Sequence, residues 1–275
     1  MLLRLLFAAL FAVTAVCAIP PQPASTNSSL KIHMLAGAPV VDGIYLDGHG
    51  PYRFVVDTGA QRSRISAALA ASLNWVPAFE TRVITQSHAV MRDGYRVRNV
   101  RLGPVETSDE EFVAASFAAI QELDPQIQGF LGQSFLSKVD YLIDFRRRQL
   151  RFGSTAVRGG VKTAFELSHG CMITPTSQGQ LTLDSGATTV VLYDPSDVKW
   201  KGHLSVRTTE GRSTVRFGEL RKLRVAGREF RNVDAAASAR RKFDETDSDG
   251  LLPASLFDSL YVSNSGGYVV FNPEQ

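Results

Sequence analysis

The chain has 275 residues, of which 44% are hydrophobic and 21% are charged, a balance typical of a globular protein. This composition excludes a collagen, a long coiled coil and a chain that is disordered throughout. The net charge of +3, from 30 basic and 27 acidic side chains, does not indicate a nucleic-acid-binding protein.

The first 18 residues have the layout of a secretory signal peptide. Arg4 precedes an apolar stretch at 5–16, and Val16-Cys17-Ala18 offers small residues for cleavage. The apolar stretch is short for a membrane span, so a membrane anchor is the weaker alternative. A lipid anchor on Cys17 is a further alternative. We expect an extracytoplasmic protein, secreted or periplasmic, that has no membrane contact after the signal peptide is removed.

Residues 19–29 are rich in Pro, Ser, Thr, Asn and Gln and predict a flexible leader. Beyond them, short apolar runs alternate with turn residues. These runs predict strands at 52–56, 95–102, 141–145, 149–152, 204–208 and 268–271. Helical patterns are few, at 66–73, about 133–138 and 254–260. The predicted fold class is therefore all-β with short helices.

One unit of the sequence occurs twice. Residues 54–60 are FVVDTGA and residues 181–187 are LTLDSGA. Later in each half, GFLGQSFL at 129–136 corresponds to GLLPASLF at 250–257. The repeat predicts two similar lobes, which we place at 30–153 and 163–275 with a linker at 154–162.

The repeated motif ends an apolar strand with a carboxylate, which is costly to bury alone. The glycine that follows permits a sharp turn and close approach of another chain, and the hydroxyl of Thr58 or Ser185 can bond nearby backbone. If the two loops face each other, Asp57 and Asp184 meet and share one proton. The ionised carboxylate then takes a proton from water while the protonated one polarises a carbonyl.

The two motifs resemble the catalytic signature of aspartic peptidases of the retropepsin–pepsin group. The alanine after each glycine is more similar to retropepsins, whereas two signatures in one chain are similar to pepsins. The segment Gly129-Phe130-Leu131-Gly132 resembles the element that supports the first catalytic loop in this family. The shared-proton behaviour invoked above is that of the aspartic-protease dyad itself.

The resemblance implies a bilobal acid-protease-like fold, with two β-barrel-type lobes and an active-site cleft between them. It implies a monomer that is an internal pseudo-dimer and that hydrolyses an extended peptide or protein substrate without a metal or cofactor. The implied residues are the catalytic Asp57 and Asp184, with loop support from Thr58, Gly59, Ser185 and Gly186.

Pro253 stands where the first lobe has Gly132, and proline fixes its backbone angle and lacks a donor. An aspartic endopeptidase is therefore the first hypothesis, and a catalytically impaired binding or inhibitory module is the alternative. A monomer that acts only after dimerisation is disfavoured because one chain supplies both aspartates.

Two hairpins are candidates for flaps over the substrate. The first, at 81–97, has a predicted turn at Met91-Arg92-Asp93-Gly94, and the second, at 206–215, has one at Thr209-Glu210-Gly211-Arg212. Ordinary surface hairpins are the alternative for both. The histidines are scattered without metal-ligand spacing. Cys171 lies in an apolar stretch and is interpreted as a small buried hydrophobe.

Overall fold

The structure, a computed structural model, describes residues 29–84, 89–154, 157–193, 195, 197–238 and 247–274. The predicted signal peptide lies outside these residues, as does the leader up to residue 28. Among the helices that the structure describes, none is long and apolar enough to cross a membrane.

The first half of the chain forms ten strands and three short helices in the described residues. They are β1 (Ser29–Leu35), β2 (Ala38–Leu46), β3 (His49–Val56), β4 (Ser63–Ser66), α1 (Ala67–Ser72), β5 (Phe79–Ile84), β6 (Ala89–Leu102), β7 (Val105–Ala115), α2 (Ala118–Gln121), β8 (Ile127–Leu131), α3 (Gln133–Leu136), β9 (Tyr141–Asp144) and β10 (Gln149–Phe152).

The second half adds strands with a single short 3₁₀ turn among its described residues. They are β11 (Val161–Ala164), β12 (Glu166–Ser168), β13 (Cys171–Thr176), β14 (Gly179–Asp184), β15 (Val190–Leu192), β16 (Val198–Thr208), β17 (Gly211–Val225), β18 (Arg228–Ala237), β19 (Gly250–Pro253), the turn at Ala254–Leu256, β20 (Ser259–Ser263) and β21 (Tyr268–Phe271). The prediction of an all-β fold with short helices is confirmed.

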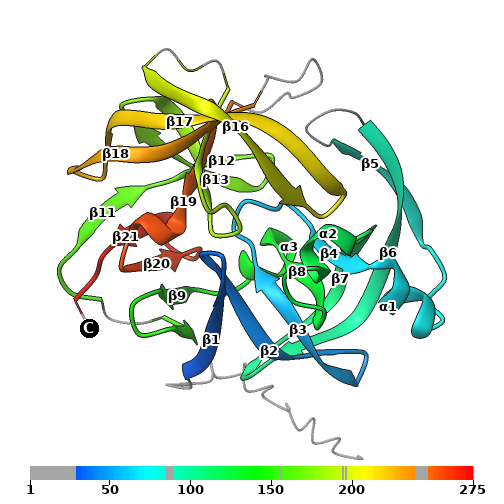
Figure 1. Ribbon diagram of the computed structural model, residues 1–275. Coiled ribbons are helices and arrows are strands. Elements are labelled where there is room, and N and C mark those ends of the chain that lie inside the picture. The colour runs from blue at the N-terminus through cyan, green and yellow to red at the C-terminus, as the bar shows by residue number, and fades with distance from the viewer. Residues whose placement is uncertain are drawn as a thin grey trace, which may run out of the picture.

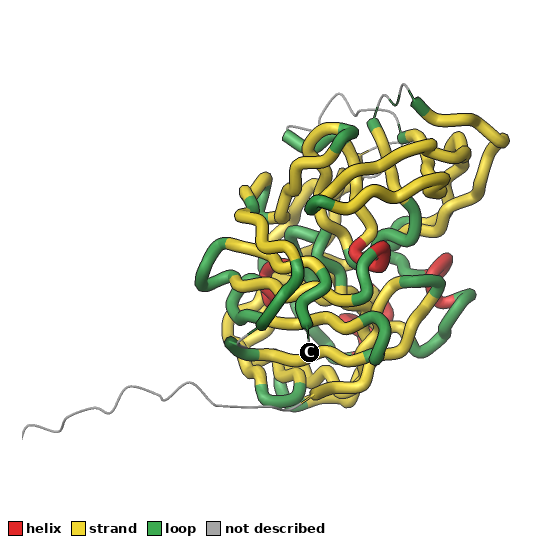
Figure 2. Tube along the Cα trace, turned by 90° about the vertical axis from the view of Figure 1, so that its left-hand side faces the viewer, coloured by secondary structure: helices red, strands yellow, loops and turns green. Residues whose placement is uncertain are grey.

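The strands form two lobes that Figure 1 shows one above the other. In the first lobe, β2, β3, β8, β4, β7, β6 and β5 are successive neighbours in one sheet. The second lobe has the order β12, β13, β14, β19, β15, β18, β17 and β16. The yellow strand trace of Figure 2 shows the same two bodies from the side.

The sequence repeat corresponds to a repeat in the structure. In the first lobe β3 pairs in parallel with β8, so that Val56 lies opposite Leu131. In the second lobe β14 pairs in parallel with β19, so that Leu183 lies opposite Leu252. All four side chains are fully buried. Each repeated motif therefore lies at the carboxyl end of a strand that is held in a hydrophobic core.

The lobes also share a sheet. β20 and β21 follow the second motif in sequence, yet β20 pairs with β9 of the first lobe, with Leu260 opposite Ile143. Leu142, Tyr261 and Val270 form a buried cluster on this shared sheet. The predicted lobe boundaries remain a prediction, and the described strands cross them at this point.

The predicted helix at 254–260 is wrong. Only Ala254–Leu256 forms a 3₁₀ turn, and Ser259–Ser263 is the strand β20. The apolar spacing of Ala254, Phe257 and Leu260 imitates a helical face. Hydrogen bonding to β9 on one side and β21 on the other outweighs this local pattern, and all five residues of β20 are buried.

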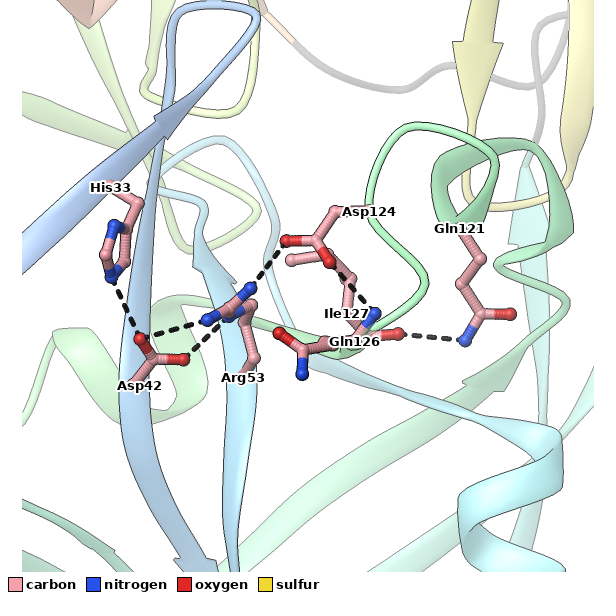
Figure 3. Close-up of polar contacts among 7 residues, drawn as sticks. All are labelled: His33, Asp42, Arg53, Gln121, Asp124, Gln126 and Ile127. Atoms are coloured by element: carbon pink, nitrogen blue, oxygen red, sulfur yellow. Dashed lines mark hydrogen bonds and ion pairs between the residues drawn. The ribbon is translucent and has the colours of Figure 1, made fainter.

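A polar network outside the core holds the strand that ends at the first motif. Arg53 on β3 donates from Nε to Asp42 Oδ1 at 2.7 Å and from Nη1 to Asp124 Oδ2 at 3.0 Å. His33 Nε2 lies 3.0 Å from Asp42 Oδ2, which adds β1 to the network (Figure 3). The network connects β3 to β2 and to the loop before β8.

Candidate active site

The structure brings the two repeated motifs together between the lobes. A Cβ added to Gly59 would lie 2.4 Å from Asp184 Cγ, and one added to Gly186 would lie 2.8 Å from Asp57 Cγ. Real Cβ atoms do not approach that closely, so each glycine leaves room for the aspartate of the other lobe. Each carboxyl group lies close enough to the other to shift its pKa, and Asp184 is 8% exposed.

The hydroxyl residues after the aspartates connect the two loops reciprocally. Ser185 Oγ accepts from Thr58 N at 3.0 Å, and Thr58 Oγ1 accepts from Ser185 N at 2.9 Å. Each hydroxyl also donates to the strand of the other lobe, Thr58 to Leu183 O at 2.7 Å and Ser185 to Val56 O at 2.6 Å. The sequence predicted that these hydroxyls bond nearby backbone. The structure shows that the backbone belongs to the opposite lobe.

Backbone amides hold each carboxylate in place. Gly59 N donates to Asp57 Oδ1 at 3.0 Å, and Asp184 Oδ1 accepts from Gly186 N at 2.7 Å and from Ala187 N at 2.9 Å. The arrangement is similar in both lobes.

Burial raises the pKa of both acids. Burial raises the pKa of Asp184 well above 3.8, and the neighbouring Asp57 raises it further by its negative charge. Burial also raises the pKa of Asp57, but the hydrogen bond from Asp184 and the charge of Arg64 oppose that rise. The proton shared by the pair is therefore favoured on Asp184, and the negative charge on Asp57.

Gly132 and Pro253 occupy different environments. A Cβ on Gly132 would lie 2.8 Å from Ala60 O and from the carbonyl of Arg62, so the first lobe has no room for a side chain there. Pro253 lies opposite Asp184 in the parallel pair and its φ is −59°, an ordinary value for proline. The second loop accommodates the proline while both amide bonds to Asp184 are kept.

A cleft of about 460 Å³ lies over the two aspartates. Both Asp57 and Asp184 line it. Apolar residues of the first lobe, including Val55, Ile120 and Phe130, line one part of it, and the end of β16 lines another. This space has the size and composition of a ligand-binding site.

The first candidate flap exists, but its predicted turn is wrong. β5 and β6 pair with Thr81 opposite Arg92 and Phe79 opposite Gly94, so residues 91–94 lie within β6. The connection of the two strands, at 85–88, lies outside the described residues. Gly94 serves packing instead of a turn, because a Cβ there would lie 2.1 Å from the ring of Phe79.

The second candidate flap lies where the sequence placed it. Thr208 pairs with Gly211, so Thr209 and Glu210 connect β16 to β17, and Arg212 already belongs to β17. Sequence reasoning missed the role of this turn in contacting the first lobe. It also missed Arg64, which lines the cleft close to Asp57. The sequence offered no signal for this role beyond the charge of Arg64 itself.

Cys171 lies beneath the first loop, where its thiol donates to Gly59 O at 3.3 Å. Burial and the two nearby aspartates raise the pKa of the thiol to about 12, so it stays protonated. This agrees with its interpretation as a buried hydrophobe. Within the part of the chain that the structure describes, no group of three or more His, Cys, Asp or Glu side chains is placed to hold a metal ion.

The fold and the paired aspartate loops are similar to those of aspartic proteases. A crystal structure of an aspartic proteinase from Irpex lacteus is similar to 90% of this chain and 97% of its own, with a TM-score of 0.54 and 11% identity. A retropepsin-like aspartic protease from Rickettsia conorii is similar over 46% of this chain and 88% of its own, with a TM-score of 0.36 and 17% identity.

In sequence, residues 43–135 match the family described as aspartyl protease. This segment includes the Asp57 motif and the supporting segment at 129–132. No curated protein matches the chain in sequence. The resemblance predicted from the sequence is thereby confirmed, as is the bilobal fold. In general terms the match and the fold support a hydrolase of the peptidase type.

Proposed function

We propose that the protein is an aspartic endopeptidase in which Asp57 and Asp184 activate water between them. One observation supports this above all others: each aspartate lies against the glycine of the other lobe's loop while amides of its own loop hold it. Bringing two carboxylates together in a buried site is unfavourable unless they share a proton. A structural role alone gives no reason for that arrangement at the floor of a cleft.

The reaction follows from the unequal environments of the pair. Ionised Asp57 takes a proton from the bound water, whose oxygen attacks the peptide carbonyl carbon. Protonated Asp184 donates its proton to the carbonyl oxygen. The C–N bond of the resulting tetrahedral intermediate then breaks as the amine nitrogen takes the proton from Asp57 and a hydroxyl of the intermediate returns a proton to Asp184. One water molecule is consumed, a carboxylic acid and an amine are released, and the pair again holds one proton.

The substrate is an extended peptide or an unfolded protein segment. The cleft between the lobes is bordered by β16, and extended peptides bind such sites by strand-like hydrogen bonding. A single chain supplies both aspartates, so the active form is a monomer. We further propose that residues 1–18 direct the protein out of the cytoplasm. Mass spectrometry of the N-terminal peptide from the exported protein distinguishes cleavage after Ala18 from a lipid on Cys17.

Cleavage of an unfolded protein mixture by residues 19–275 tests the proposal from about pH 3 to about pH 8. Asp57→Asn and Asp184→Asn should each reduce the rate by about 10²–10⁴-fold, the usual contribution of a general acid or base. Asp42→Asn is the matched control, because Asp42 pairs with Arg53 away from the cleft. Cleavage that survives both active-site substitutions contradicts the mechanism. A folded but inactive wild type supports the binding-module alternative.

The cleavage rate should rise and then fall with increasing pH. The rate rises as the first carboxyl group of the pair ionises and falls as the second loses its proton. Since the pKa values of both groups are raised, both limbs of the profile should lie above the ordinary aspartate value of 3.8. A flat profile contradicts the shared proton.

A further inference from the structure

The β16–β17 hairpin crosses the cleft and touches the first lobe. Phe117 N donates to Thr209 O at 3.1 Å, and Arg64 Nη1 donates to Thr209 Oγ1 at 2.9 Å. Arg212, on the same hairpin, forms an ion pair with Glu122 just after α2. Figure 1 shows the end of β16 beside α2 and β4. The tip is therefore a contact between lobes and not a free surface turn.

Glu210 at this tip is held between two arginines of the first lobe. Its Oε2 accepts from Arg92 Nη2 at 2.6 Å and Nε at 3.1 Å, and its Oε1 lies 3.5 Å from Arg64 Nη1. The Glu210 side chain is 7% exposed, against 34% for Arg92 and 24% for Arg64. Two guanidinium groups that converge on one buried carboxylate form an anion-binding site of high specificity.

This site adjoins the catalytic cleft, and Arg92 reaches it through Glu210. Arg64 and Glu210 line the same cavity as the two aspartates. Arg64 is also close enough to Asp57 for its charge to lower the pKa of that group. A peptide that enters the cleft has to pass the hairpin tip, since residues 204–210 line it.

Movement of the tip away from the first lobe would withdraw Glu210 from both arginines. Separating a largely buried ion pair is unfavourable unless another partner replaces the lost carboxylate. The replacement with matching chemistry is a second carboxylate, and a peptide lying along the cleft can supply it from an aspartate or glutamate side chain.

We propose that Arg64 and Arg92 form a carboxylate-binding subsite of the cleft, which Glu210 fills in the absence of substrate and an acidic substrate side chain fills during cleavage. The inference rests on the proposed peptidase function and adds a substrate class to it. Acidic peptides are the preferred substrates, and Arg64 and Arg92 are specificity-determining residues.

Paired peptides test the proposal. Each pair is identical except for Glu or Gln at one position, and the pairs scan the positions on both sides of the scissile bond. At one position the Glu peptide should have a kcat/KM about 10-fold or more above its Gln partner, the range of one charge-assisted hydrogen bond. Equal kcat/KM values at every position would overturn the proposal.

Three variants distinguish a carboxylate-binding subsite from a hairpin that only closes the cleft. Arg92→Gln should abolish the preference for Glu. Glu210→Gln should lower KM for the Glu peptide more than for the Gln peptide, because it removes the internal competitor. Arg96→Gln is the matched control, since Arg96 also lies on β6 but is 69% exposed and pairs with Glu111. If Glu210→Gln lowers KM equally for both peptides, the hairpin only closes the cleft and the subsite is refuted.

A binding measurement separates this proposal from the proposed function. Calorimetry with the same peptides, carrying a reduced and uncleavable central bond, requires no turnover. Tighter binding of the Glu form to an inactive wild type supports the subsite and contradicts the peptidase. Cleavage without any preference contradicts only the subsite, and absence of binding by both forms contradicts both. Thermal unfolding of Arg92→Gln verifies that the variant is folded.

Discussion

Asp184 shows how burial changes the chemistry of a single residue. Its pKa is raised, so at a pH between 3.8 and the raised value the folded state binds more protons than the unfolded state. Stability therefore falls as the pH rises through this interval. The ionised pair opposes folding, and the amide bonds of the loops and the packing of the lobes have to outweigh it.

We predict that Asp184→Asn is more stable than the wild type at pH 7 by several degrees in the unfolding midpoint. Asparagine keeps an oxygen acceptor for Gly186 N and Ala187 N but introduces no charge. The difference should vanish near pH 3, where the wild-type carboxyls are protonated in both states. Thermal unfolding across this range is the measurement.

Asp42→Asn is a control, because its effect on stability at pH 7 should have the opposite sign. The hydrogen bond from Arg53 lowers the pKa of Asp42, so its stabilisation is present above the ordinary pKa and is lost as the pH falls through the lowered one. Its substitution should reduce stability at pH 7, and only slightly because the group is half exposed. An Asp184→Asn variant that is less stable than the wild type at pH 7 would contradict the assigned pKa direction.

At the scale of elements, the β3 and β14 strands are joined through their terminal loops. The hydroxyls of Thr58 and Ser185 each accept one bond and donate another across the lobes. These hydroxyls bind buried backbone groups. Removal of one hydroxyl therefore leaves two groups of the opposite lobe without a partner, one amide and one carbonyl. Such loss is more costly than the net value of a single hydrogen bond.

We predict that Thr58→Val and Ser185→Ala each lower the free energy of unfolding by about 1–3 kcal/mol. The two effects should be non-additive, because each residue serves the other. Denaturant unfolding in a double-mutant cycle measures the coupling. Thr107→Val is the matched control, since its buried hydroxyl has no hydrogen-bond partner within the described residues. Additive effects would show that the loops are anchored independently.

Element boundaries were predictable where the residues themselves determine them. Strands at 149–152 and 268–271 coincide with β10 and β21, and α1 begins after the Ser66 cap, whose hydroxyl accepts from Leu69 N. Two elements were not predictable. The turn assigned to 91–94 uses Gly94, which the ring of Phe79 requires for space, and the helix assigned to 254–260 becomes β20 because β9 and β21 pair with it.

At the scale of the whole molecule, the two lobes are not independent. β9 of the first lobe pairs with β20 of the second, and a buried cluster of Leu142, Tyr261 and Val270 lies on that sheet. Without the second lobe, β9 would become an exposed edge with apolar side chains. Exposed edges of this kind promote association.

We predict that residues 30–153 alone do not form a stable monomer. Circular dichroism and size-exclusion chromatography should show a destabilised or aggregated species, and co-expression with residues 163–275 should restore a folded complex. The intact chain should unfold in one cooperative transition. A soluble, monomeric first lobe with native-like unfolding would mean that the shared sheet adds little.

The sequence by itself determined the β-rich fold, the duplicated motif and the identity of the two aspartates, because apolar periodicity and turn residues act over a few neighbouring positions. The tertiary structure decided the rest. Thr58 and Ser185 are 127 residues apart, and their reciprocal bonds depend on how the lobes pack. The same packing places Glu210 between Arg64 and Arg92 and gives Asp57 and Asp184 different electrostatic surroundings. Such contacts leave no local pattern, since each partner alone is compatible with an ordinary strand or turn.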